Sequence, residues 1–125
     1  EVKMEFVCLG CLDETIWATF TPEQQQENMQ RCFAYDDVLR EEGHFNDGYA
    51  LMPANMAVTV RTRAGQVTVT EGPFAETKEM LGGLLFLEAH DLNHAVALMS
   101  KHPGTEFGSF EIRPVHVEMN KLIRK

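Results

Sequence analysis

The sequence has no basic run and no long hydrophobic stretch, and both absences exclude classes of function. Its 125 residues contain 11 lysines and arginines against 19 aspartates and glutamates, which gives a formal net charge of −8. Nucleic acids and anionic membranes attract basic surfaces, so neither is an expected partner. No stretch is long enough to span a bilayer, and no signal-peptide pattern opens the sequence. We therefore expect a protein of the cytoplasm.

Cysteine is scarce, and its number is odd: the chain has three. This is typical of a reducing compartment, not of a disulfide framework. Cys8 and Cys11 form a CxxC, but Cys8 falls inside a predicted strand, no helix starts at once and no second CxxC follows, so we expect neither redox nor zinc chemistry. His90 and His94 are separated by Asp91, a predicted helix cap, and need not share a face. The sequence thus predicts no metal and no cofactor.

The residues that are present fit one globular domain over residues 1–125, with 44% hydrophobic and 24% charged residues. "TPEQ" is a capping box with a proline starter and predicts a helix from about Pro22 to about Glu42 that stops at Gly43. A second helix is predicted from about Leu92 to Lys101. Strands are predicted at "MEFVCLG", "HFNDGYALM", on both sides of "RAGQ", at "GGLLFLEA" and at "SFEIRPV". This order predicts an α+β sandwich of ferredoxin-like type with an inserted hairpin.

Two of the predicted strands are apolar on both faces. In "LLFLEA", Leu84 and Phe86 alternate with Leu85 and Leu87, and "MEFVCLG" behaves in the same way. A sheet that is apolar on both faces must be covered on both, and in this topology the two helices pack on one face. A second copy of the sheet is the simplest cover for the other. We therefore predict a homodimer, in which two sheets can close into a dimeric α/β barrel.

The first long helix carries an acidic residue, Asp36, within its apolar stripe. The stripe is formed by Met29, Cys32, Phe33 and Leu39. A carboxylate directed at a core is expected to be paired or to have a raised pKa, and Arg40, four residues later, is a candidate partner. Asp36 is then a candidate catalytic residue. The alternative is a slight rotation of the helix that brings Asp36 to water at the edge of the stripe.

The stretch "EGPFAETKEMLGG", residues 71–83, combines turn residues with charge. Glu71 shares the parity of two strand valines, and an inward carboxylate at the mouth of a sheet is a candidate general acid or base. Glu76 and Lys78 could supply charge partners, and Phe74 could anchor the turn by burial. The alternative is structural: the Gly-Pro pair sets the turn, Phe74 fills the core, and Glu76 and Lys78 form a solvated ion pair.

Arg113, in "SFEIRPV", has the parity opposite to Ile112. If Ile112 faces the helices, Arg113 faces the interior of the barrel and could bind a substrate carboxylate through two hydrogen bonds. An ion pair of Arg113 with Glu111, Glu71 or Asp36 is the alternative.

"VTVTEGPFAETKEMLGGLLFLEAHDLNHAVALMSKHPG" followed by "GSFEIRPV" resembles the YCII-related proteins of the DGPF-domain type, and the likeness covers essentially the whole chain. Glu71 stands where the motif that names the family has aspartate. The resemblance implies a bacterial, cytosolic, dimeric α+β barrel. Most members have no established activity, and some relatives act on small aromatic or lactone-like compounds through a His–Asp pair. The first predicted helix carries no histidine that would match this pair.

Two functions remain open from the sequence. The first is a cofactor-independent enzyme of isomerase, lyase or dehalogenase type with a pocket near the "EGPFAETKE" turn, acting on a small anionic or aromatic compound. Glu71 and Asp36 would then transfer protons, and the substrate-binding residues would be Arg113, Phe74, Glu76 and Lys78. The second is a binding or regulatory module that uses the same cleft, or a protein contact, without turnover.

Overall fold

A computed structural model describes residues 3–73 and 78–124 of the chain. The strands are β1 (Met4–Asp13), β2 (Phe45–Ala50), β3 (Val58–Arg63), β4 (Gln66–Glu71), β5 (Glu79–Ala89) and β6 (Gly108–Pro114). The helices are α1 (Glu14–Trp17), α2 (Pro22–Glu41), α3 (Leu92–Met99) and α4 (Val117–Ile123), with short 3₁₀ helices η1 (Ala54–Met56) and η2 (Pro103–Glu106). The predicted order of elements is confirmed, and α4 is an element that the sequence analysis did not predict.

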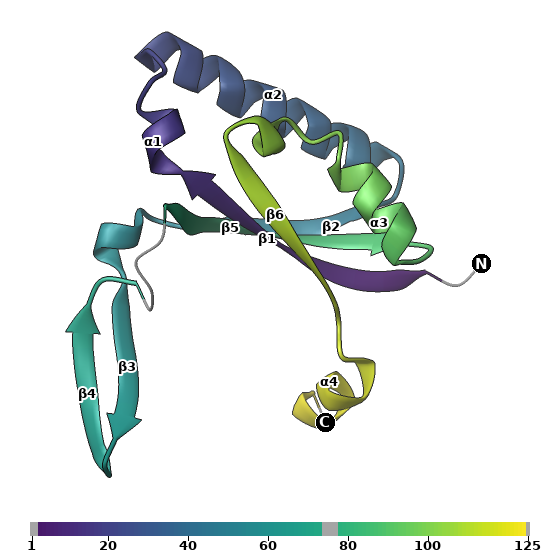
Figure 1. Ribbon diagram of the computed structural model, residues 1–125. Coiled ribbons are helices and arrows are strands. Elements are labelled where there is room, and N and C mark those ends of the chain that lie inside the picture. Colours follow the sequence, from purple (N-terminus) through teal and green to yellow (C-terminus); the bar gives the residue numbers. More distant parts are fainter. Residues whose placement is uncertain (1–2, 74–77, 125) are drawn as a thin grey trace.

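The main sheet is antiparallel and has the strand order β2-β5-β1-β6. Helices α2 and α3 cover one face of this sheet, whereas the hairpin β3–β4 forms a separate two-stranded sheet (Figure 1). With the hairpin left out, the strands follow the order 2-3-1-4, which confirms the ferredoxin-like α+β fold.

Local sequence signals set the ends of both long helices. At the start of α2 the Thr21 hydroxyl accepts a hydrogen bond from the backbone of Gln24, whose side chain accepts one from the backbone of Thr21, so the capping box is present. Gly43, just beyond α2, has a φ of +81°, a conformation that glycine adopts without strain. The Asp91 carboxylate caps α3 by accepting from the backbone of His94. Helix α3 ends at Met99, two residues before the predicted end.

The core lies between the helices and the sheet. Alternate residues of β1 and β5 point into it, and the buried cluster consists of Phe6, Cys8, Leu39, Leu85, Leu87, Ala89, Ala95 and Met99. The predicted apolar stripe of α2 is only partly buried: Leu39 is fully covered, but Met29 and Phe33 are 40% and 56% exposed. The remaining part of the stripe borders a cavity.

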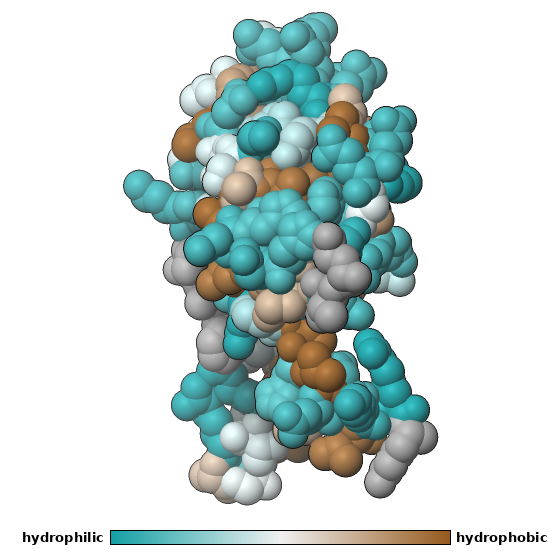
Figure 2. Space-filling model, turned by 90° about the vertical axis from the view of Figure 1, so that its right-hand side faces the viewer, coloured by the Kyte–Doolittle hydropathy of each residue, from teal (hydrophilic) through white to brown (hydrophobic). Residues whose placement is uncertain are grey.

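The other face of the sheet and the elements beside it carry much exposed apolar surface. The β3–β4 hairpin and α4 both extend past this face, away from α2 and α3 (Figure 1). One face of the hairpin presents Val58, Val60, Val67 and Val69, and α4 presents Val117, Met119, Leu122 and Ile123, all exposed. Figure 2 shows hydrophobic side chains at the surface of this lower part of the molecule. Within the described residues, no helix has the length and apolar composition to cross a membrane.

Candidate functional site

A cavity of about 390 Å³ lies between α2, the sheet and the loop that contains η2. Its walls are largely apolar and include the aromatic rings of Phe33, Phe45, Tyr49, Phe107 and Phe110. Besides the Tyr49 phenol, the ionisable groups on the wall are Asp36, His102 and three cysteines, and the described lining residues include no lysine or arginine. The cavity is therefore an apolar space with a few polar groups, as small-molecule sites commonly are.

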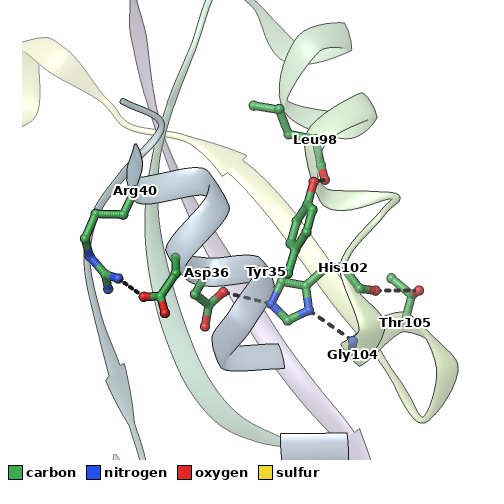
Figure 3. A network of polar contacts seen from close by, with 8 residues as sticks. Tyr35, Asp36, Arg40, Leu98, His102, Gly104 and Thr105 are labelled. Carbon is green, nitrogen blue, oxygen red and sulfur yellow. Dashed lines mark hydrogen bonds and ion pairs between the residues drawn. The ribbon is translucent and has the colours of Figure 1, made fainter. Parts of the chain in front are cut away.

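Asp36 and His102 form a hydrogen-bonded pair at the wall of this cavity (Figure 3). The His102 Nε2 atom lies 2.9 Å from the Asp36 Oδ1 atom. The backbone N–H of Gly104 donates to His102 Nδ1 at 3.0 Å, so Nδ1 is an acceptor and the neutral ring carries its proton on Nε2. His102 is only 4% exposed, whereas 22% of the Asp36 side chain is exposed. His102 thus donates to a carboxylate that keeps partial access to solvent.

Packing holds the His102 ring in this orientation. The Tyr35 and Phe110 rings meet it edge to face, at centroid distances of 5.4 and 4.7 Å. The Tyr35 hydroxyl is itself anchored, because it donates to the backbone carbonyl of Leu98 at the end of α3. A Cβ atom at position 104 would lie 3.0 Å from Phe110 ring carbons and 3.2 Å from His102 Nδ1. Glycine at this position therefore permits the close approach of its own N–H to the ring.

The partner of Asp36 differs from the sequence prediction. Arg40 was the candidate partner, but it forms an ion pair with Asp37. The Arg40 guanidinium also lies 4.4 Å from the centroid of the Phe45 ring. That prediction is wrong because the Asp36 carboxylate contacts His102, and Arg40 pairs instead with Asp37, three residues before it. His102 takes the role of partner. The sequence analysis missed it, since 66 residues separate the pair.

The cysteines that line the cavity are protonated thiols. Burial raises the pKa of Cys8 to about 12. Burial, followed by the negative charge of Asp36, raises the pKa of Cys32 to about 11. Burial and nearby carboxylates also raise the pKa of Cys11. Because the thiolate is the nucleophilic and metal-binding form, these values leave the cysteines as soft, uncharged wall residues.

The residues predicted on the "EGPFAETKE" turn do not line this cavity where the structure describes them. Glu71 ends β4 opposite Val58 and is exposed, on the same face of the hairpin as the valines. Lys78 is exposed just before β5. Phe74 and Glu76 lie outside the described residues. Of the predicted site residues that are described, Asp36 alone lines the cavity.

Arg113 lies on the face of the sheet away from the helices. It borders a second hollow, of about 400 Å³, together with Arg124 and His116. The Arg113 Nε atom is 3.8 Å from a Glu111 carboxylate oxygen, which matches the ion-pair alternative. Arg113 and Asp36 therefore lie on opposite sides of the sheet.

Three histidines gather near the start of α3. The rings of His90 and His94 stack at 4.6 Å, and His44 meets His94 edge to face at 5.0 Å. The sequence analysis left open whether His90 and His94 share a face, and the structure shows that they do, although Asp91 caps α3 between them. In the described part of the chain, no three His, Cys, Asp or Glu side chains are arranged to hold a metal ion.

Comparison with known proteins places the chain within one family. The model of the YCII-related domain matches residues 4–119. An uncharacterized protein of Rhizobium meliloti (strain 1021) is 33% identical over 116 residues, which cover 90% of this chain and 92% of that relative.

Proposed function

The chain belongs to the YCII-related family, and from this premise and the cavity we propose that it is a cofactor-independent proton-transfer enzyme of isomerase or lyase type. The observation that carries the proposal is the Asp36–His102 pair, which supplies a carboxylate and a positioned ring N–H at the wall of an apolar cavity. A titratable group held within hydrogen-bonding reach of a bound compound is what general acid–base catalysis requires.

The size and lining of the cavity suit a small compound. Its volume, about 390 Å³, falls in the lower part of the range of ligand sites. Aromatic rings and soft sulfur atoms on the wall favour a flat, apolar body. The polar contacts would come from Asp36.

The charge of the cavity favours an uncharged or aromatic substrate over an anionic one. The described lining contains the Asp36 carboxylate and no lysine or arginine to offset it. An anionic substrate would be repelled by Asp36 and would meet no cation there. Arg113, proposed from the sequence as the group that binds an anion, lies on the other face of the sheet and would act at a different hollow.

We further propose that the protein is a cytoplasmic homodimer. Val7, Leu9, Leu84 and Phe86 line the face of the sheet away from the helices, and a second copy packed there would cover them. The three cysteines are free thiols, in keeping with a reducing compartment. Light scattering at micromolar concentration should give the mass of a dimer, and the mass of a single chain would contradict this part of the proposal.

The proposed activity can be tested without knowing the substrate. A library of small metabolites is screened by thermal shift against the wild type, Asp36→Asn and, as a matched control, Asp37→Asn. Each compound that raises the melting temperature is then incubated with enzyme in D₂O and examined by NMR for deuterium uptake or a new product. We expect turnover with the wild type and Asp37→Asn and none with Asp36→Asn.

The same screen separates an enzyme from a binding module. Compounds that stabilise the wild type, bind in the cavity and show neither deuterium uptake nor product would support the non-catalytic alternative. Equal turnover by Asp36→Asn and the wild type would show that the Asp36–His102 pair takes no part in the reaction.

A further inference from the structure

We infer that Asp36 is the group that exchanges a proton with the bound compound, and that His102 is a positioning residue that donates to it. This assignment rests on the proposed function and gives each member of the pair its role. It reverses the arrangement in which a histidine acts as the base and an aspartate orients it.

The first argument is that both nitrogens of His102 are engaged. Nδ1 accepts the backbone N–H of Gly104 at 3.0 Å, and Nε2 donates to Asp36 Oδ1 at 2.9 Å. A backbone N–H can only donate, so the Nδ1 lone pair, the site where a neutral imidazole with this tautomer would take up a proton, is directed at Gly104. The ring has no basic nitrogen free for a substrate.

The second argument is that the ring cannot readily turn to free a nitrogen. Tyr35 and Phe110 pack against it, and Phe110 also limits the space at position 104. Rotation by 180° would direct ring carbons at the Gly104 N–H and at the Asp36 carboxylate. Two hydrogen bonds would be lost in a setting where His102 is 4% exposed, at a cost of about 1–3 kcal/mol for each unsatisfied group.

The third argument is that Asp36, unlike His102, has a polar atom that is available to a bound compound. One carboxylate oxygen accepts from His102, and the structure gives Asp36 no second hydrogen-bond partner among the described residues. The side chain is 22% exposed and lines the cavity. Figure 3 shows the other carboxylate oxygen directed away from the His102 ring. That oxygen has an acceptor position for an acidic C–H or O–H of a bound compound.

The proton balance of the step is simple. The free Asp36 oxygen takes a proton from the compound, which becomes the conjugate base, and the same carboxyl group returns a proton to another atom of the compound. No electrons leave or enter, and no co-reactant is needed. While the carboxylate is charged, the Nε2–H of His102 stabilises it, and the ring stays neutral through the cycle.

Gly104 helps to hold the His102 ring in the orientation in which it donates to Asp36. Its N–H fixes the tautomer by occupying Nδ1, and a side chain there would press on Phe110 and His102. The backbone around it is fixed in turn by Thr105, whose hydroxyl donates to the His102 carbonyl at 2.9 Å. The loop therefore orients the ring, and the ring orients the carboxylate.

The ring can be examined directly by NMR of ¹⁵N-labelled full-length protein, with His102 assigned by comparison with His102→Gln. We expect a ring with an unprotonated Nδ1 and a protonated Nε2, in the free protein and after addition of 2-indanone, an uncharged bicyclic ketone with acidic C–H bonds. A proton on Nδ1, or on both nitrogens, would overturn the assignment whether or not any compound reacts.

Deuterium exchange of 2-indanone in D₂O provides the second readout, with Asp36→Asn, His102→Gln and Asp37→Asn compared with the wild type. If Asp36 is the base, Asp36→Asn should lower the enzyme-dependent exchange rate by about 10²–10⁴-fold. His102→Gln should lower the exchange rate by a smaller factor, because the glutamine amide can still donate to Asp36. Asp37→Asn should show the exchange rate of the wild type. A loss with His102→Gln as large as with Asp36→Asn would overturn the inference. Absence of exchange by the wild type would count against the proposed function, while the ring protonation would still decide the role of His102.

Discussion

The helix-covered face of the sheet and one face of the β3–β4 hairpin both carry rows of apolar side chains, yet the first is buried and the second is exposed. On the first, Phe6 and Leu87 are completely buried beneath α2 and α3. On the second, Val60 and Val69 are 65% and 66% exposed, although they lie directly opposite each other across the hairpin. Alternation of apolar and polar residues thus determines which face of a strand is apolar, but it does not determine whether another part of the same chain packs against that face. The hairpin has the pattern of a buried surface, but none of the residues that the structure describes covers its valines.

The two regions should differ most in the loss of unfolding free energy when one apolar side chain in each is truncated to alanine. Phe6→Ala should lower the free energy of unfolding by about 3–5 kcal/mol, because it opens a cavity in a closed core. Val60→Ala, in an exposed face of the hairpin, should change it by no more than about 0.5 kcal/mol. Urea unfolding measures both. If Val60→Ala cost as much as Phe6→Ala, the hairpin would be buried in solution, against a second copy or another protein.

His102→Ala should have the next largest effect. Removing the ring leaves the partly buried Asp36 carboxylate without its donor, which should cost about 1–3 kcal/mol of unfolding free energy. The double variant with Asp36→Asn should cost less than the sum of the single variants, because the two changes remove the same interaction. Thermal or urea unfolding of the four proteins measures this coupling. Strict additivity would mean that the hydrogen bond contributes no stability.

The sequence predicted the fold well but did not predict the partner of Asp36, and the two outcomes have different physical origins. Strand alternation, the capping box at Thr21 and the cap at Asp91 are local patterns, and the structure confirms the elements that they predict. The pairing of Asp36 with His102 depends on where a loop after α3 passes over α2, and no local pattern records that. The position of Asp36 in an apolar stripe did mark it as unusual.

Two other differences from the sequence analysis, at Arg40 and at α4, also concern contacts or elements that no local pattern fixed. Arg40 was a plausible partner of Asp36 because residues four apart are neighbours on a helix, but Asp37, three residues before Arg40, is an equally near carboxylate and is the one that pairs with it. Helix α4 was missed because it is short and follows the last strand of the expected fold. Arg113 was assigned to the correct face of its strand, but strand parity could not show that Asp36 lies on the other side of the sheet.

A smaller effect is expected from acid at the histidine cluster. Partial burial, followed by the neighbouring His90 and His44, lowers the pKa of His94 in the folded protein, and Lys3 adds to this while Asp91 opposes it. The unfolded chain therefore binds a proton at His94 more readily, and stability should fall as the pH drops through about 6.5, the ordinary histidine value. Protonation would also remove the Nδ1 acceptor of the His90 N–H.

The measurement is the melting temperature as a function of pH, for the wild type and for His94→Gln. The variant should show a flatter dependence between about pH 7 and 5, because it lacks the titrating group. Equal slopes for the two proteins would assign the acid sensitivity to other residues.

The smallest effect is expected at Glu71, the hairpin residue that the sequence analysis placed in the site. Its carboxylate is exposed at the end of β4, and the residue does not line the cavity of Asp36 and His102. Glu71→Gln should therefore change the free energy of unfolding by less than about 0.5 kcal/mol. It should also leave the thermal shift produced by cavity-binding compounds at the wild-type value, whereas Asp36→Asn alters it. If Glu71→Gln instead abolished that response with stability unchanged, the working carboxylate would be at the "EGPFAETKE" turn, and the hairpin would have to approach the cavity of this chain or of a second copy. A lower melting temperature with an intact response would make Glu71 a structural residue of the turn.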